Sequence, residues 1–93
     1  MAALQSPSHT LASINAEQLS TSNAAYRAIC VTARDGNTTP IQIGGANITA
    51  TTGGKRLSPG DAFWFGPSSI TFSLADIYVA GLTIGDVIDT ICV

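Results

Sequence analysis

The sequence predicts an all-β fold, a small antiparallel β-sandwich (jelly-roll-like) of seven or eight short strands with an extended N-terminal arm. Runs rich in Val, Ile, Tyr, Phe and Thr alternate with clusters of Gly, Pro, Asn and Asp about every 6 to 12 residues. No link between runs is long enough for the helical crossover that parallel strands need. With 93 residues, the chain has room for one domain.

Residues 24–93 carry the strand and turn signals, so we expect them to form the β-sandwich domain. The turn signals include Asp35-Gly36-Asn37 and Ser58-Pro59-Gly60-Asp61, and the second has Pro and Gly at the positions that a type II turn requires. Lys55-Arg56 is typical of a solvated turn. The expected strands are residues 25–32, 40–43, 47–52, 62–65, 69–74, 77–80 and 86–93. We expect the first and last of them to pair, which would let Cys30 and Cys92 face each other.

Residues 1–23 are expected to form the extended N-terminal arm, because this segment is polar and Ser-rich and lacks turn chemistry and sustained alternation. Its isolated apolar residues cannot form a core alone, so we expect the arm to gain order by laying them on a partner. The predicted partner-binding residues of the arm are Leu4, Leu11, Ile14 and Leu19.

The composition indicates a protein that works inside an assembly. Charged residues make up 11% of the chain and hydrophobic residues 45%, with a mean hydropathy of +0.31, whereas a typical soluble domain has about 25% charged residues. A monomer with so little charge would be poorly soluble, so we expect a homo-oligomer. The alternative is a surface rich in Thr, Ser and Asn that stays hydrated without charge.

Charge and hydropathy also exclude some partners. The net charge of −2 argues against nucleic acid, which requires a basic surface. No apolar run approaches the roughly 20 residues of a membrane helix. The start of the chain has no cationic and apolar signal peptide, so we expect assembly in a cytoplasm with Cys30 and Cys92 as buried, reduced thiols.

Catalytic residues are scarce, and we expect no enzyme, no cofactor and no metal site. The single histidine, His9, lies in the predicted arm and has no scaffold as a catalytic base. Asp86 and Asp89 are three residues apart on a predicted strand, so their side chains point to opposite faces.

The aromatic run Phe63-Trp64-Phe65 is the feature that most favours a binding role. In a strand, the two Phe side chains face one way and Trp64 the other. Three interpretations are open: the Phe pair fills the core and Trp64 covers the second face, Trp64 anchors a protein contact, or Trp64 stacks on a sugar.

From residue 24 to the end, the chain resembles the small capsid decoration (cement) and head-fibre-like proteins of tailed phages. The residues that carry the resemblance are YRAICVTA at 26–33 with its DGN turn, IQIGGANIT at 41–49, KRLSPGD at 55–61, LADIYVAG at 74–81 and the final Val/Ile-rich strand. The resemblance implies a β-sandwich, often trimeric, on the exterior of a capsid shell. It supplies no individual binding residues.

These observations together predict a structural virion protein that oligomerises, as a trimer, and stabilises the shell by binding the major capsid protein. One alternative is a tail or baseplate component of the same fold. Another is a carbohydrate-binding adhesin module that uses Trp64 and Tyr78 as stacking platforms.

Overall fold

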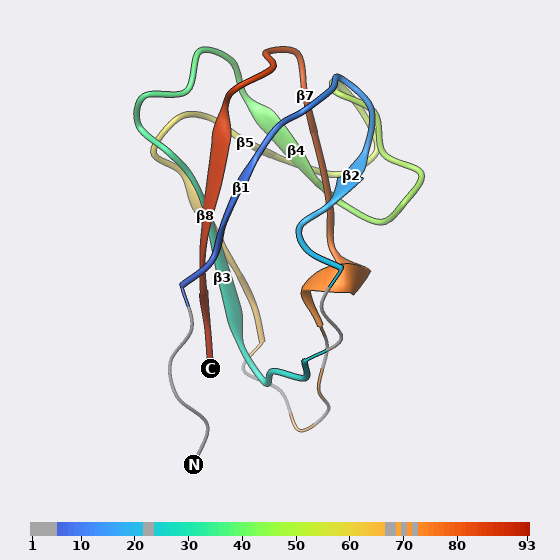
Figure 1. Ribbon diagram of the computed structural model, residues 1–93, viewed down its shortest axis with the longest axis vertical. Coiled ribbons are helices and arrows are strands. Elements are labelled where there is room, and N and C mark those ends of the chain that lie inside the picture. Colours follow the sequence, from blue (N-terminus) through green and yellow to red (C-terminus); the bar gives the residue numbers. More distant parts are fainter. Residues whose placement is uncertain (1–5, 22–23, 67–68, 70, 72) are drawn as a thin grey trace.

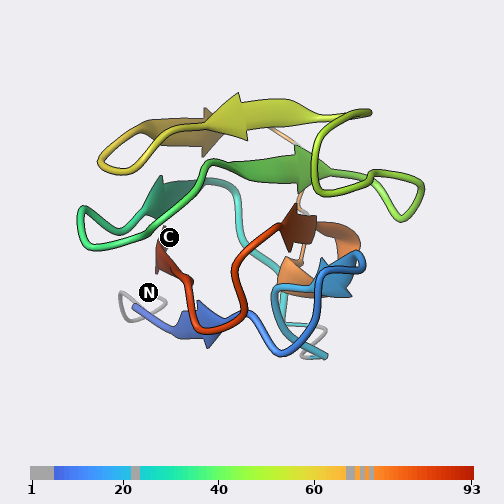
Figure 2. The same cartoon turned by 90° about the horizontal axis from the view of Figure 1, so that it is seen from above.

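The structure is a computed structural model that describes residues 6–21, 24–66, 69, 71 and 73–93. Two four-stranded antiparallel sheets face each other (Figures 1 and 2), which confirms the predicted all-β sandwich. Sheet A has the strand order β1-β8-β3-β6 and sheet B the order β2-β7-β4-β5. The elements are β1 (Ser8–Thr10), β2 (Glu17–Gln18), β3 (Ile29–Ala33), β4 (Ile41–Gly44), β5 (Lys55–Leu57), β6 (Ala62–Phe65), the 3₁₀ helix η1 (Leu74–Asp76), β7 (Tyr78–Gly81) and β8 (Val87–Cys92).

The strands pair in a nested order. β4 pairs with β5, β3 with β6, β2 with β7 and β1 with β8, so each pair encloses the previous one along the chain. The pairs alternate between the two sheets, and the contacts of β3 with β8 and of β4 with β7 complete each sheet. This nested pairing of eight strands is the arrangement of a jelly roll.

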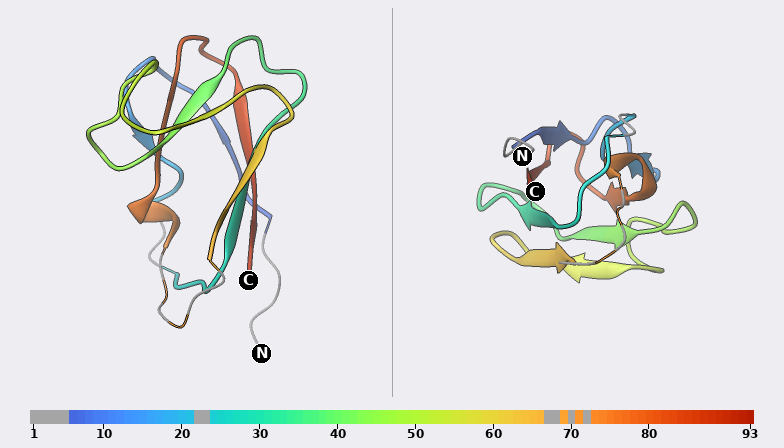
Figure 3. Two further views of the ribbon diagram at one scale, coloured as in Figure 1. Left: turned by 180° about the vertical axis from the view of Figure 1, so that it is seen from behind. Right: turned by 90° about the horizontal axis from the view of Figure 1, so that it is seen from below.

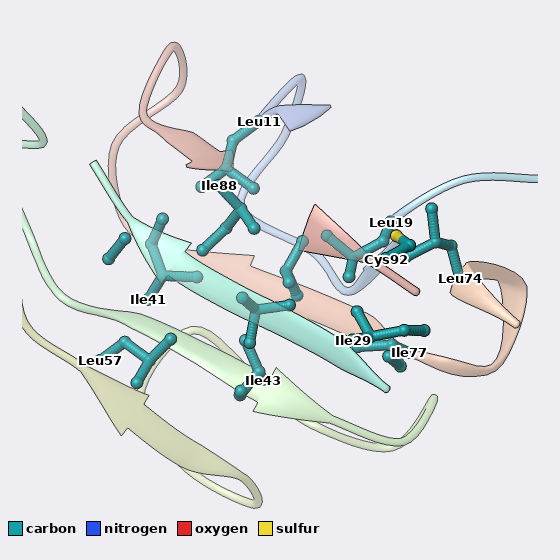
Figure 4. Packing of buried hydrophobic residues seen from close by; sticks show 13 residues of the cluster. Leu11, Leu19, Ile29, Ile41, Ile43, Leu57, Leu74, Ile77, Ile88 and Cys92 are labelled. Carbon is teal, nitrogen blue, oxygen red and sulfur yellow. The ribbon is translucent and has the colours of Figure 1, made fainter. Parts of the chain in front are cut away.

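The core lies between the sheets and is built by period-2 alternation. On β3, Ile29, Val31 and Ala33 are fully buried, and the register places them opposite the inward-facing residues of β8. Sheet B contributes Ile41 and Ile43 from β4 in the same way. The buried cluster, most of which is labelled in Figure 4, comprises Leu11, Leu19, Ile29, Val31, Ala33, Ile41, Ile43, Leu57, Leu74, Ile77, Val79, Ile88 and Cys92.

The N-terminal segment belongs to the sandwich, so the predicted boundary at residue 24 is wrong for residues 6–21. β1 pairs with β8 at the edge of sheet A, and β2 pairs with β7 at the edge of sheet B. Leu11 and Leu19 are 1% and 6% exposed. Both enter the core because the chain crosses from sheet A to sheet B between them and closes one side of the sandwich (Figure 1).

The predicted pairing of the first and last domain strands is confirmed, but its register separates the cysteines. Ile29 lies opposite Cys92, and Cys30 lies opposite Ile91. Neighbouring residues of a strand point to opposite faces. Cys92 therefore points into the core, in the same cluster as Leu19 and Leu74 (Figure 4), whereas Cys30 points to the outer face. The strand pairing therefore does not let the two cysteines face each other.

The turn signals formed turns, but most of them connect different sheets. In Ser58-Pro59-Gly60-Asp61, Gly60 has a φ of 91° and the amide of Asp61 donates to the carbonyl of Ser58 at 2.8 Å, as a type II turn requires. This turn takes the chain from β5 in sheet B to β6 in sheet A. Asp35-Gly36-Asn37 likewise leads from β3 to β4, in the other sheet.

Two predictions for the chain between β4 and β6 are wrong. Residues 47–52 form a loop with a turn and bends rather than a strand. The hydroxyl of Thr49 accepts hydrogen bonds from the amides of Thr51 and Thr52, which curls the chain. Lys55 and Arg56 lie in β5 rather than in a turn.

The predicted strand over residues 69–74 falls partly outside the described residues. Its last residue, Leu74, begins η1 instead, where the Asp76 carboxylate accepts hydrogen bonds from the amide and the hydroxyl of Ser73.

Candidate interaction surface

The outer face of sheet A carries an apolar row that runs across three neighbouring strands. Trp64 on β6 lies opposite Cys30 on β3, and Cys30 lies opposite Ile91 on β8. Residues that are directly opposite in an antiparallel pair point to the same face, with Cβ atoms about 4.5–5.5 Å apart. We call Trp64, Cys30 and Ile91 the apolar row.

The two ends of the apolar row are open to solvent and its centre is covered. Trp64 is 52% exposed and Ile91 44%, whereas Cys30 is only 8% exposed because it lies between these two larger side chains. Val93, which continues the alternation of β8, is 56% exposed. A solvent-facing tryptophan that flanks aliphatic side chains is typical of the centre of a protein interface.

The two phenylalanines lie on the other face of β6. Phe63 is opposite Val31, and Phe65 is opposite Ile29. Their rings meet edge to face, with centroids 5.1 Å apart and an interplanar angle of 81°. Phe65 packs against the core, but Phe63 is still 36% exposed because β6 is an edge strand. The prediction that Trp64 and the Phe pair occupy opposite faces is confirmed.

A polar cluster lies further along the same outer face. The guanidinium of Arg34 donates to both carboxylate oxygens of Asp89, at 2.7 and 3.0 Å, and the hydroxyl of Ser8 also donates to Asp89. The hydrogen bonds from Arg34 and Ser8 outweigh the effect of burial and lower the pKa of Asp89. The outer face of sheet A is therefore divided, with an apolar row at one end and an ion pair near the other.

The predicted partner-binding residues differ in whether they are buried or exposed. Leu11 and Leu19 are buried in the core and cannot contact a partner, because β1 and β2 are built into the sheets. Ile14 is 54% exposed, in the loop between these strands. Leu4 lies outside the described residues. Of these predicted residues, Ile14 and Trp64 are on the surface.

No family model, no curated protein and no solved structure matches the chain. The resemblance to phage decoration proteins therefore depends on the strand and turn patterns alone. None of the helices that the structure describes is long and apolar enough to cross a membrane.

The histidine has a scaffold, contrary to the expectation from the sequence. His9 lies on β1, and its Nε2 is 2.8 Å from Glu17 Oε1. The carboxylate of Glu17 also accepts hydrogen bonds from the amides of Ala12 and Ser13 and from the Ser13 hydroxyl. Burial alone would raise the pKa of Glu17, but these hydrogen bonds together lower it. These interactions of Glu17 hold the loop between β1 and β2 in place.

The other titratable side chains also have structural roles. Asp86 is buried and accepts hydrogen bonds from the amides of Thr38 and Thr39 at 3.0–3.2 Å. It is separate from Asp89, which points to the outer face. Within the described residues, no three His, Cys, Asp or Glu side chains are grouped so as to hold a metal ion.

One small pocket lies on sheet B. Its volume is about 130 Å³, and it is lined by Pro40, Gln42, Ala50, Thr51, Arg56 and Leu82. Sites for drug-sized ligands measure roughly 300–1,000 Å³, so this pocket is too small for such a ligand.

The two aromatic residues proposed to stack on sugar lie on opposite sides of the molecule. Trp64 is on the outer face of sheet A. Tyr78 is opposite Gly44 and next to the inward-facing Val79, so it lies on the outer face of sheet B. They cannot form one stacking platform.

The sequence indicated Trp64 but missed Cys30 and Ile91 as its neighbours. Cys30 and Ile91 each stand among other apolar residues of their strands, so the pattern alone does not show that these two leave the core face. Their alignment with Trp64 depends on the registers of β3 with β6 and with β8, which no local signal determines.

Proposed function

We propose that this chain is a structural virion protein, a capsid decoration or cement protein that oligomerises and binds the major capsid shell. The observation that carries the proposal is the exposed apolar row on the outer face of sheet A, in a chain of which only 11% is charged. A solvent-facing tryptophan beside an exposed aliphatic side chain is the kind of anchor that protein interfaces use.

The physical mechanism is burial of this row against another protein. Removing apolar surface from water contributes roughly 25 cal/mol per Å², and a large, rigid indole contributes most where it fills a pocket. A protein attached across neighbouring shell subunits would oppose their separation by the same free energy. The ion pair of Arg34 and Asp89 on the same face would add orientation more than affinity.

The phage assignment rests on the resemblance and on the fold. Jelly rolls recur in viral capsid and lectin domains, so this fold is consistent with a virion protein by analogy. A tail or baseplate component would use the same surface. On this proposal the protein acts on the capsid exterior after assembly in the host cytoplasm, and its partners are its own copies and the major capsid protein.

Quantifying the protein in purified particles tests the proposal. Mass spectrometry of gradient-purified virions from the source culture should find this chain at a number of copies comparable with that of the shell subunits. A much lower number would favour a tail or baseplate component. Absence of the chain from the particle fraction would contradict the virion assignment.

A matched pair of isoleucine variants tests the surface. Ile91 belongs to the apolar row, and Ile84, 64% exposed, lies in the loop before β8. Ile91→Ser should reduce co-sedimentation with particles lacking the native protein at least about tenfold, the effect of losing roughly 1.4 kcal/mol of binding free energy. Ile84→Ser should bind as the unaltered protein does. Equal binding by both variants would exclude the apolar row as the contact.

A further inference from the structure

The edge of β6 that faces away from β3 has unusual properties for a small sandwich. β6 ends sheet A, and among the described residues it pairs with β3 alone (Figure 3, left, where β6 is yellow-orange and β3 teal). Its four residues, Ala62–Phe65, carry no charge and no proline. Natural proteins protect exposed sheet edges with charge, proline or very short strands.

The register shows which backbone groups point out from this edge. Ala28 and Val93 exchange backbone hydrogen bonds, and the amide of Arg34 donates to Val87, so the even-numbered residues of β3 bond to β8. The odd-numbered residues bond to β6, as the bond from the amide of Ala33 to Asp61 shows. Ala62 and Trp64 lie opposite even-numbered residues of β3, which bond to β8 instead. The backbone N–H and C=O groups of Ala62 and Trp64 therefore point away from the sheet.

The other three edges oppose pairing between identical copies. β5 carries Lys55 and Arg56, so two copies of it would bring like charges together. β1 is three residues long and contains His9, and β2 has only Glu17 and Gln18. β6 is the longest of the four edges and the one without a titratable side chain.

The β6 edge is complementary to itself. In an antiparallel pairing centred on Phe63, Ala62 of one copy lies opposite Trp64 of the other, and each such pair exchanges both of its N–H···O=C bonds. The small Ala62 leaves space beside the indole on the outer face. On the inner face the two Phe63 rings, each 36% exposed, meet at the two-fold axis.

We propose that two copies of this chain associate through their β6 edges, with Phe63 opposite Phe63, to join two A sheets into one continuous sheet. The pairing places both Trp64 side chains on the same outer face, so two apolar rows form one surface. This inference specifies the self-association in the proposed function, but the geometry of β6 alone carries it. It assigns a two-fold contact where the resemblance implies a trimer.

A proline at the outward-facing amide of Ala62 tests the contact. The amide of Ala62 points outward, so Ala62→Pro removes a donor from the proposed contact and none from the ladder with β3. By light scattering, the unaltered protein should have twice the 9.5 kDa chain mass and Ala62→Pro the single mass, with an unchanged circular dichroism spectrum.

Thr10→Pro is the matched control. Thr10 is exposed at the opposite edge of sheet A. Leu11 donates to Asp86, and Thr90 donates to Pro7, so the odd-numbered residues of β1 bond to β8 and the amide of Thr10 points outward. This variant should remain dimeric. A monomeric or trimeric unaltered protein, or a folded Ala62→Pro that remains dimeric, would overturn the inference.

Cross-linking supplies a second test that does not need Ala62→Pro to fold. Directly opposite residues of a non-hydrogen-bonded pair have Cα atoms about 4.5 Å apart, within the range for a disulfide. Under mild oxidation Phe63→Cys should give a disulfide-linked dimer on a non-reducing gel, and Thr10→Cys should not. Equal linking of both variants, or none of Phe63→Cys, would contradict this register.

These readouts separate the dimer from the proposed function. A monomeric protein that binds virions would overturn the β6 contact and leave the proposed function standing. A β6-linked dimer that is absent from virions would support the β6 contact and contradict the proposed function.

Discussion

At the scale of single residues, the surroundings of the two cysteines depend on a one-residue offset in register. Cys92 lies opposite Ile29 and is fully buried, and burial raises the pKa of its thiol. Cys30 points to the outer face, where Trp64 and Ile91 cover it. Because the two side chains leave β3 and β8 on opposite faces, an intramolecular disulfide would require the strands to shift.

We expect Trp64 to control how fast Cys30 reacts. In the folded protein, iodoacetamide should alkylate Cys30 before Cys92, since Cys92 is fully buried and burial raises the pKa of its thiol. Trp64→Ala uncovers Cys30 and should speed its alkylation several-fold while leaving that of Cys92 unchanged. Peptide mass spectrometry over a time course measures both rates. An unchanged rate at Cys30 would mean that the indole does not cover it.

At the scale of elements, the loop between β1 and β2 is held by one carboxylate. Glu17 accepts hydrogen bonds from the amides of Ala12 and Ser13. The same carboxylate contacts the imidazole of His9, which lies on β1. The same carboxylate therefore fixes the loop and links the edges of both sheets. Loss of its charge would loosen the turn that carries Leu11 into the core.

Glu17 should make the protein acid-sensitive. The folded-state pKa of Glu17 is lowered from 4.5, so its stabilisation is fully present above that value and is lost as the pH falls through the folded-state pKa. Glu17→Gln should lower the urea midpoint at neutral pH and lower it less at about pH 3. Asp35→Asn, which removes the charge of an exposed loop carboxylate, is the control and should not reproduce the loss at neutral pH. An equal loss at both pH values would contradict the role of the charge.

Local patterns predicted some elements and missed others for identifiable reasons. The strands near residues 29–33, 41–44, 62–65, 78–81 and 87–92 were predicted because each alternates or is rich in β-branched and aromatic residues. β1 and β2 were missed because strands of three and two residues show no period. Residues 47–52 alternate like a strand, but the Thr49 hydroxyl satisfies the local amides instead.

At the scale of the whole molecule, topology decided what the sequence could not. Turn chemistry predicted where the chain bends but not that most turns cross between sheets, since a type II turn fits either case. The same limit applies to the candidate site. Trp64 was identifiable as an aromatic on the second face of its strand, whereas its neighbours Cys30 and Ile91 come from strands far along the chain.

The nested pairing makes residues 6–21 an integral part of the sandwich. Ser8 pairs with Asp89 across almost the whole chain, and Leu11 fills the core between the sheets, where a Cβ on Gly81 would lie 2.8 Å from its Cδ1. Leu11→Ala should lower the free energy of unfolding by about 2–5 kcal/mol, the cost of a buried cavity. Ile14→Ala, in the same loop but 54% exposed, should change it by less than about 0.5 kcal/mol.

Truncation extends the same test to the whole segment. Removing residues 1–21 deletes both edge strands β1 and β2 and two leucines of the core, so the remaining chain should lose the cooperative unfolding transition that the full chain shows in urea. Fluorescence of Trp64 and far-UV circular dichroism follow that transition with two separate probes. If the truncated chain unfolds with a midpoint near that of the full chain, residues 24–93 are a domain on their own and β1 and β2 are dispensable additions to its edges.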